Sequence, residues 1–473
     1  MDPYEPPSPA TAGLHKRGSF LELFSVALPL MISAGSHSVM SVADRMMLAR
    51  YVPGAASGAE TLDVIAAVTP AGMLHWTVAC LPIGVILYAN TFIAQYDGAQ
   101  KPKQMIASFW QAVWVAIFTG LLLLIPMLFS GAVFRAVGHN DIVVAQETAY
   151  FNTLCGGSTV MMTCAALSCF FSGRRKTWVV MWVNVFSVII NITLDYGLIY
   201  GHWGLPSLGI RGAAMATVCA RCCELCLYIY LIRRHRGEYA FRETCRVDRS
   251  VLKKYVEFGV PSGLHYFVDN VSFLMFLFIV GSMSREAMAA TNLAFSVNSM
   301  VFVPLLGFGT AVQTVVGNHI GANVLEAVPR TTWNAARMGL VWTGVASILL
   351  IFFPETSLAV FSSGGSNPSA QSIAAVLPLS AQLLKFVAVY SVFDSLAVVF
   401  AASLRGAGDT MFPMLMTMCS SWLIMTVPAW VISLQDGATI HMLWMTCTAH
   451  IIVMGTAMTV RFMSGRWKRI QVT

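Results

Sequence analysis

The sequence predicts an all-α polytopic membrane protein, with about twelve transmembrane helices in two six-helix lobes related by a pseudo-twofold axis along the membrane normal. Of its 473 residues, 57% are hydrophobic and only 11% are charged, whereas a soluble domain carries about 25% charged residues. The apolar residues come in blocks of about 20 to 30, the length that a helix needs to cross roughly 30 Å of hydrocarbon. A transmembrane β-barrel would instead alternate over segments of about 10 residues.

Short polar or Gly- and Pro-bearing breaks separate these blocks, and each block predicts one span. The expected spans are residues 20–49, 62–95, 108–130, 143–171, 177–200, 208–232, 253–283, 287–318, 334–358, 372–404, 411–433 and 439–462. The Pro-rich, polar residues 1–19 predict a disordered cytoplasmic tail. Lys16 and Arg17 imitate the basic start of a signal peptide, but no clear small-residue cleavage site follows. We therefore expect the first helix to be retained.

Basic residues set the expected orientation. If the N-terminus lies inside, the inner segments hold most of the 29 Lys and Arg residues, and the positive-inside rule places both termini in the cytoplasm. We expect a multi-pass protein of the plasma (inner) membrane, with a cytoplasmic tail at 464–473. The formal net charge of +7 is then explained by the basic residues of the inner segments. Nucleic-acid binding is not expected, because no basic stripe with interleaved aromatics lies outside the spans.

The chain divides into two halves with weak self-similarity. The charged stretch at 233–252 predicts a cytoplasmic linker between an N-lobe at 20–232 and a C-lobe at 253–463. Two pairs of stretches recur in the same order: AQYDGAQKPKQMIASFWQA at 94–112 resembles GNHIGANVLEAVPRTTWNA at 317–335, and FFSGRRKTWVVM at 170–181 resembles SLRGAGDTMFPM at 403–414. Because each half has an even number of spans, both enter the membrane in the same orientation. The binding cavity is then expected between the halves.

Four aspartates inside the predicted spans are the first functional candidates, because a charge at the bilayer centre costs about 3 kcal/mol on insertion scales and usually marks function. They are Asp44, Asp195, Asp269 and Asp394. Asn191 lies one helical turn before Asp195, so an amide and a carboxylate share one helix face. Two oxygens so placed suit a hard cation such as Na⁺. The alternative is a hydrogen bond that joins neighbouring helices.

Other polar residues accompany these aspartates, and ion pairs are the alternative to function. Arg45 follows Asp44 directly, which fits a helix-end ion pair. Lys385 lies nine residues before Asp394, half a turn off in angle, so an ion pair between them would fit poorly. The remaining auxiliary polar candidates are His37, on the same helix face as Asp44, and His265 and Asn270, which accompany Asp269.

Further motifs resemble the multidrug and toxic compound extrusion (MATE) family, and within it the NorM-like bacterial branch. They are DRMMLARY at 44–51, the Gly-Ala turns at 98–99 and 321–322, FFSGRRKT at 170–177, NITLDYGLIYG at 191–201, GIRGAAMATV at 209–218 and ASLRGAGDTMFPML at 402–415. The resemblance covers nearly the whole chain after residue 20. It implies a twelve-helix secondary transporter that exports organic cations or other amphipathic compounds in exchange for Na⁺ or H⁺. It implies no enzyme activity and no cofactor besides the coupling ion, and we expect a monomer in the lipid bilayer.

The resemblance also assigns roles to individual residues. A cation site in the first half is implied for Asp44, Asn191, Asp195 and Thr217. In the second half, cation coupling or substrate binding is implied for Asp269, Asp394 and Tyr390. The branch generally carries Glu where this chain has Asp269, so the acidic arm here is one methylene shorter. A buried carboxylate can alternate between protonated, Na⁺-bound and substrate-paired states, because desolvation and a neighbouring cation act on its charge in opposite directions.

Two other functions are alternatives, and each would require residues that the sequence largely lacks. A lipid-linked saccharide flippase of the same superfamily would need several cationic cavity residues for pyrophosphate, but the spans offer chiefly Arg221 and Lys385. A membrane-embedded enzyme such as a metallohydrolase would need a motif of the type H-E-x-x-H or G-x-S-x-G, and the sequence has neither. RCCELC at 221–226 contains a C-x-x-C spacing that could bind a metal or act in redox chemistry. A single such pair inside an apolar helix more often packs a helix face.

Overall fold

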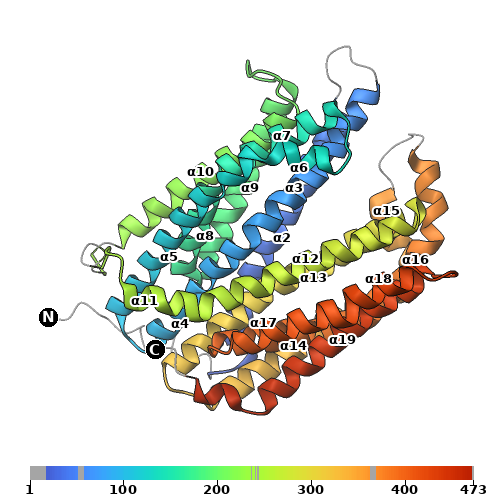
Figure 1. Cartoon of the computed structure of the whole chain (residues 1–473). Helices are drawn as coiled ribbons and strands as arrows, with labels where there is room; N and C mark the ends of the chain where they lie inside the picture. Colours follow the sequence, from blue (N-terminus) through green and yellow to red (C-terminus); the bar gives the residue numbers. More distant parts are fainter. Residues whose placement is uncertain are drawn as a thin grey trace. The chain divides into compact units, whose positions relative to one another are not determined.

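The computed structural model describes residues 17–51, 58–235, 237–239, 241, 244–362 and 369–470. Within these residues the chain is helical, and no β-strand occurs among them (Figure 1). The predicted tails at 1–19 and 464–473 and the predicted linker at 233–252 lie partly outside the described residues. The disorder predicted for the first sixteen residues therefore stays a prediction.

The first half of the chain forms a series of long helices joined by short turns. They are α2 (Phe20–Arg50), α3 (Gly58–Leu87), α4 (Ala89–Gly98), α5 (Pro102–Leu122), the 3-10 helix η1 (Ile125–Leu128), α6 (Ser130–Ala136), α7 (Asp141–Gly156), α8 (Ser158–Ser172), α9 (Thr177–Tyr200), α10 (Ile210–Arg234) and α11 (Arg249–Lys254). A π-helical turn, η2 (Tyr255–Gly259), leads into α12 (Val260–Met283).

The second half repeats this pattern. Its helices are α13 (Arg285–Gly321), α14 (Ala327–Phe352), α15 (Pro354–Ser362), α16 (Ser369–Gly406), α17 (Met411–Ser420), the π-helical turn η3 (Ser421–Thr426), α18 (Val427–Ser433), α19 (Ile440–Met463) and the 3-10 helix η4 (Arg466–Arg469). By length and hydropathy, the described residues hold 11 candidate membrane spans, or up to 12 when the bent pair α7–α8, with its 43° angle, counts as one. The predicted number of about twelve spans is confirmed.

The chain forms two compact units whose limits fall inside helices. Among the described residues, unit 1 lies within 32–263, and unit 2 lies within 17–31 and 264–470. The first twelve residues of α2 therefore belong to unit 2, and the first residues of α12 belong to unit 1. The predicted lobes, 20–232 and 253–463, assign each of these helices to a single lobe.

Backbone geometry supports the internal repeat. Gln100 and Asn323 follow α4 and α13 with φ of 55° and 57°, in the left-handed region that non-glycine residues rarely adopt. Arg175 and Gly408 follow α8 and α16 with φ of 59° and 96°. These pairs fall at matching positions of the two recurring stretches. The two halves thus share both similar sequence stretches and the backbone conformation of the turns that follow these helices.

Each unit has its own apolar core. In unit 2, Phe276, Val387, Trp444 and neighbouring side chains from α12, α13, α16 and α19 form one buried cluster. In unit 1, a second cluster joins α2, α3, α7, α9 and α10 around Phe151 and Ile199. This second core holds the helices that carry the first candidate site.

Candidate functional site

Helix α9 presents a polar stripe to the interior of unit 1. Asn184, Ser187, Asn191 and Asp195 are all buried, at exposed fractions of 8% or less. Their spacing of three or four residues places them on one helix face. The helix ends at Gly201, whose φ of 77° suits glycine. An otherwise apolar helix therefore carries its amide and carboxyl groups inward.

Helix α10 lies against the end of this stripe because Gly212 lacks a side chain. A Cβ atom at Gly212 would lie 2.5 Å from the carbonyl oxygen of Leu198 in α9, which leaves no room for any larger residue. This close approach brings Thr217, five residues further along α10, next to Asn191. Helix α2 completes the site by contributing Asp44, which is 8% exposed.

Asn191 joins the two acids. When its amide nitrogen faces them, it lies 3.1 Å from Asp195 Oδ2 and 3.1 Å from Asp44 Oδ1 as a donor, and its oxygen accepts from the Thr217 backbone N–H at 3.3 Å. The opposite orientation would place the nitrogen 3.4 Å from Thr217 Oγ1 and turn the amide oxygen towards acceptors. We assign the first orientation, since it gives both the amide nitrogen and the amide oxygen of Asn191 hydrogen-bond partners.

The two acids also contact each other. A side-chain hydrogen bond joins Asp44 and Asp195, and such a bond requires that one carboxyl group carries the proton. Asp195 is fully buried, and its Oδ1 atom has no hydrogen-bond partner. A buried oxygen left without a partner costs free energy. The two carboxyl groups therefore lie close together in a buried setting, and Asn191 contacts both of them.

Two further residues act on this site electrostatically. Tyr150, a buried residue of α7, interacts with both Asp44 and Asp195. Arg45 has an exposed side chain and interacts favourably with Asp44. The predicted set omitted Tyr150, and its only sequence signal is the polar run ETAYFN inside a span. Among the ion pairs of the described residues there is none between Asp44 and Arg45, so the alternative of a helix-end ion pair has only their electrostatic interaction behind it.

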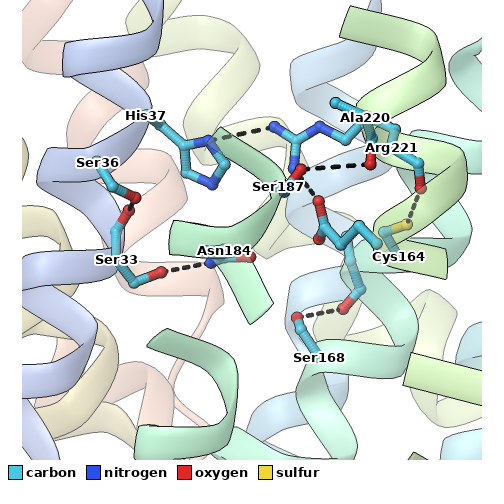
Figure 2. A network of polar contacts seen from close by, with 11 residues as sticks. Ser33, Ser36, His37, Cys164, Ser168, Asn184, Ser187, Ala220 and Arg221 are labelled. Carbon is cyan, nitrogen blue, oxygen red and sulfur yellow. Dashed lines mark hydrogen bonds and ion pairs between the residues drawn. The ribbon is translucent and has the colours of Figure 1, made fainter. Parts of the chain in front are cut away.

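His37 belongs to a different cluster of unit 1. Figure 2 shows its ring next to Arg221 of α10, with His37 Nδ1 3.3 Å from a guanidinium nitrogen. Arg221 donates to Glu224 Oε2 at 2.7 Å, and Glu224 is buried. Nearby, Asn184 donates to Ser33 and Cys164 contacts the Arg221 carbonyl oxygen (Figure 2). Arg221 is thus neutralised by its neighbour one turn away.

In unit 2 the predicted acids come from different helices but lie within electrostatic reach. Asp269 of α12 and Asp394 of α16 interact, and Tyr390 interacts with Asp394. Tyr390 is buried, Asp394 is half-buried and Asp269 is exposed. Cys447 of α19, which the sequence did not indicate, interacts with both acids. The side chains of the unit 2 acids are therefore less enclosed by the protein than those of unit 1.

The auxiliary residues of unit 2 have separate roles. His265 Nδ1 lies 2.8 Å from Thr417 Oγ1 of α17 rather than beside Asp269. Asn270 is half-buried next to Asp269. Lys385 is exposed and, among the described residues, forms no ion pair with Asp394. The predicted angular mismatch between Lys385 and Asp394 agrees with this geometry.

The cysteines do not form a metal or disulfide framework. All eleven are free thiols. The four on α10 at 219, 222, 223 and 226 are exposed. Across the described parts of the chain, no group of three or more His, Cys, Asp or Glu residues is placed to hold a metal ion. Any cation at the acid sites would be held by two carboxylates and neutral oxygens.

Known proteins resemble the whole chain. The MatE family model matches residues 29–197 and 261–431, which is more than half of the sequence. The probable multidrug resistance protein NorM of Thermotoga maritima is 27% identical over 450 residues, covering 95% of this chain and 93% of its own length. Multidrug resistance protein PmpM of Pseudomonas aeruginosa is 25% identical over 432 residues, covering 88% and 84%.

Solved structures agree on the fold. A MOP superfamily transporter from Pyrococcus furiosus, described as having a binding pocket of reverse polarity, superimposes with a TM-score of 0.86. It is 18% identical, and the match covers 98% of this chain and 100% of that one. With the family model matched in both halves, this chain belongs to the MatE family, whose members are membrane transporters and not enzymes.

Proposed function

We propose that this chain is a secondary antiporter that exports organic cations or other amphipathic compounds in exchange for Na⁺ or H⁺. The observation that carries the proposal is the buried pair Asp44 and Asp195, whose carboxyl groups contact each other and are both contacted by the amide of Asn191. The names of the NorM and PmpM relatives support multidrug substrates. The coupling ion would be the only accessory species, since transporters of this family need no cofactor.

The two acid sites would have different roles in transport. In unit 1, Na⁺ or a proton binds among Asp44, Asn191 and Asp195, with Thr217 fixing the amide. In unit 2, Asp269 and Asp394 are less enclosed by the protein and lie near Tyr390, which suits a bulky cation better than a dehydrated ion. A ligand that favours one conformation by about 1.4 kcal/mol shifts the populations tenfold. Alternating access of the two lobes would convert that preference into export.

The setting follows from the charge pattern. We propose that the protein is a monomer in the plasma (inner) membrane with both termini in the cytoplasm, as the basic residues indicate. The flippase alternative gains no support, because Arg221 is paired with Glu224 and Lys385 is exposed.

Transport by purified protein in liposomes tests the function. Ethidium efflux is measured with a Na⁺ gradient and with a pH gradient, each imposed separately, for the wild type and for Asp44→Asn, Asp269→Asn and Asp394→Asn. We expect at least one gradient to drive efflux in the wild type and Asp44→Asn to lose that response. Asp436→Asn, at an exposed turn before α19, is the matched control. Full gradient-driven efflux in all three variants would eliminate the coupling role of these acids.

A further inference from the structure

A pocket lies at one end of unit 1, apart from the acid sites described above. Its volume is about 610 Å³, and its walls come from α6, α7 and the start of α10. Helix α7 packs against both of the other helices (Figure 1). The charged and polar side chains of the lining are Arg135, Asp141, Thr148, Asn152 and Arg211, and the other lining residues are Gly, Ala and Val. Two cationic side chains and one anionic side chain therefore share a common space.

The short helix α6 is fixed so that Arg135 stays at the surface. Phe134, the residue before it, is buried, and its ring packs edge-on against Phe151 of α7 with the centroids 6.1 Å apart. After α6, His139 Nδ1 lies 2.9 Å from Glu147 Oε1 of α7. Because successive residues of a helix point in different directions, the burial of Phe134 leaves Arg135 exposed. The nearby acid Glu147 already has a partner, so it does not neutralise this arginine.

Helix α10 supplies the second arginine. Arg211 is the second residue of α10 and directly precedes Gly212, the residue that lets α10 approach α9 closely. The side chains of Arg135, Asp141 and Arg211 are all exposed. Among the described residues, none of these three side chains forms an ion pair or a hydrogen bond. Their charges are therefore available to a ligand.

Two neutral groups of α7 add hydrogen-bonding capacity to the pocket. Asn152 Oδ1 accepts a hydrogen bond from Ser130 at 2.9 Å, so the amide nitrogen of Asn152 remains a donor. Thr148 Oγ1 is buried and has no partner in the part of the chain that the structure describes. A Cβ atom at Gly131 would lie 3.7 Å from this oxygen, so a larger residue there would cover it with an apolar group. A buried hydroxyl without a partner costs free energy, which a hydrogen bond from a ligand would offset.

The pocket lies at the level where predicted membrane spans end. Arg135 and Asp141 fall between the predicted spans 108–130 and 143–171. The chain around them exposes large apolar side chains, namely Leu128, Phe129, Val133, Val137 and Ile142. Charged groups beside exposed apolar ones are typical of the zone in which lipid head groups meet the acyl chains. A membrane lipid is therefore the ligand that this position favours.

The charges of the pocket select the chemistry of the head group. On the orientation proposed above, this end of unit 1 faces outward, where the positive-inside rule expects few arginines. A guanidinium group matches two oxygens of a phosphate at once. Asp141, in the same pocket, repels a head group that carries only negative charge and attracts an ammonium group. Two arginines and one aspartate thus fit a zwitterion in which a phosphate is joined to an ammonium.

Unit 2 pairs the comparable side chain internally. His441 is the second residue of α19, as Arg211 is of α10. Helix α19 packs against α16, as α10 packs against α7. His441 Nε2 lies 2.8 Å from Gln382 Oε1 of α16. At this helix start, the side chain of unit 2 therefore has a protein partner, whereas that of unit 1 has none among the described residues.

We propose that this pocket binds a phospholipid whose head group joins a phosphate to a primary ammonium, as in phosphatidylethanolamine. Arg135 and Arg211 donate to the phosphate, and Asp141 accepts from the ammonium. The acyl chains lie along the exposed apolar side chains of η1 and α6. The ligand is a component of the membrane and not an exported compound, so this site goes beyond the proposed function. A bound lipid would join α6, α7 and α10 at this end of unit 1.

Native mass spectrometry of the delipidated full chain in detergent tests the site. Phosphatidylethanolamine, phosphatidylcholine and phosphatidylglycerol with identical acyl chains are titrated separately. In the wild type we expect one phosphatidylethanolamine to bind at least fivefold more tightly than either of the others. Phosphatidylcholine has no ammonium hydrogens for Asp141, and phosphatidylglycerol has no ammonium group. Glycerophosphoethanolamine, the soluble head group, should compete at least tenfold more weakly than the lipid, because it lacks the acyl chains.

Variants assign the binding to this pocket. The double variant with Arg135→Gln and Arg211→Gln should bind phosphatidylethanolamine at least tenfold more weakly. Asp141→Asn should lose the preference, so that phosphatidylethanolamine and phosphatidylglycerol bind within twofold of each other. Arg285→Gln, which replaces an exposed arginine at the start of α13, is the matched control and should bind as the wild type does. Thermal unfolding of each variant checks that these exposed substitutions keep the fold.

Three outcomes would overturn the proposal. They are binding of phosphatidylethanolamine by the double variant as tight as by the wild type, equal binding of the three lipids by the wild type, and competition by the soluble head group as strong as by the lipid. The last outcome would make the ligand a soluble phosphate ester. Because no transport is measured, failure here leaves the proposed function untouched, and failure of transport leaves this result standing.

Discussion

The acids of unit 1 and unit 2 differ in how their neighbours hold them. Asp44 and Asp195 contact each other, and the amide of Asn191 contacts both. Asp269 and Asp394 interact only at longer range, with Asp269 exposed and Asp394 half-buried. The same residue type is therefore enclosed and hydrogen-bonded in one unit and less enclosed by the protein in the other. A small ion needs fixed oxygens, whereas a bulky and variable passenger needs space and charge.

The largest expected effect comes from removing the buried carboxylate of unit 1. Asp195→Asn replaces an acid by an amide that can neither share the proton nor bind a cation, so gradient-driven ethidium efflux should fall about a hundredfold. Exchanging proteoliposomes between Na⁺ and pH gradients measures the loss. Asp436→Asn, an exposed acid before α19, serves as the control. Efflux within twofold of the wild type would refute a preorganised ion site in unit 1.

Asp394→Asn should weaken binding of the exported compound rather than binding of the coupling ion. Removing this charge weakens attraction to an organic cation by roughly 1.4 kcal/mol, or about tenfold in apparent KM, while the concentration of Na⁺ or H⁺ giving half-maximal rate stays within twofold. Initial rates at varied ethidium and at varied ion concentration separate the two. Equal changes in the apparent KM for ethidium and in the half-maximal ion concentration would mean that the acids of the two units have the same role.

Adding one methylene should separate the two settings further. Asp195→Glu forces an extra carbon into a fully buried position, which costs about 1–3 kcal/mol when a core is overpacked, and we expect at least a tenfold loss of efflux. Asp269→Glu lengthens an exposed side chain, so the loss should not exceed about threefold. Efflux and thermal unfolding are measured on both variants. Equal losses of efflux in the two variants would contradict the contrast between the enclosed acids of unit 1 and the more exposed acids of unit 2.

The smallest effect is expected at Thr217. Its backbone N–H, not its hydroxyl, contacts Asn191, and the hydroxyl donates to the Ala213 carbonyl oxygen of its own helix at 3.1 Å. Thr217→Val should therefore change the half-maximal ion concentration by less than about threefold. Ion titration of transport in the variant checks this value. A tenfold change would make the hydroxyl a ligand of the coupling ion.

Sequence reasoning located residues that share one helix and missed contacts between helices. The four-residue spacing of Asn191 and Asp195 was enough to place both on one face, because helix geometry alone sets that angle. The same rule placed His37 with Asp44, yet the His37 ring contacts Arg221. Periodicity gives the direction of a side chain, not the neighbour that it meets. Tyr150 and Cys447 were missed for this reason.

The pairing of Glu22 with His319 in unit 2, at 3.2 Å between Oε1 and Nε2, also could not be predicted. Glu22 falls inside the predicted span at 20–49, and nothing in the spacing of that span shows that its first turns pack in unit 2. The repeat between 94–112 and 317–335 indicated two similar segments but not the residues that contact them.

The membership of the first turns of α2 in unit 2 has a consequence for synthesis at the ribosome. Glu22 is translated 297 positions before His319. At about 5–20 residues per second, the helix start would wait about 15–60 s for its partner. During that interval the contact between Glu22 and His319 cannot form, so the first turns of α2 reach their final packing only after most of the second half has been translated.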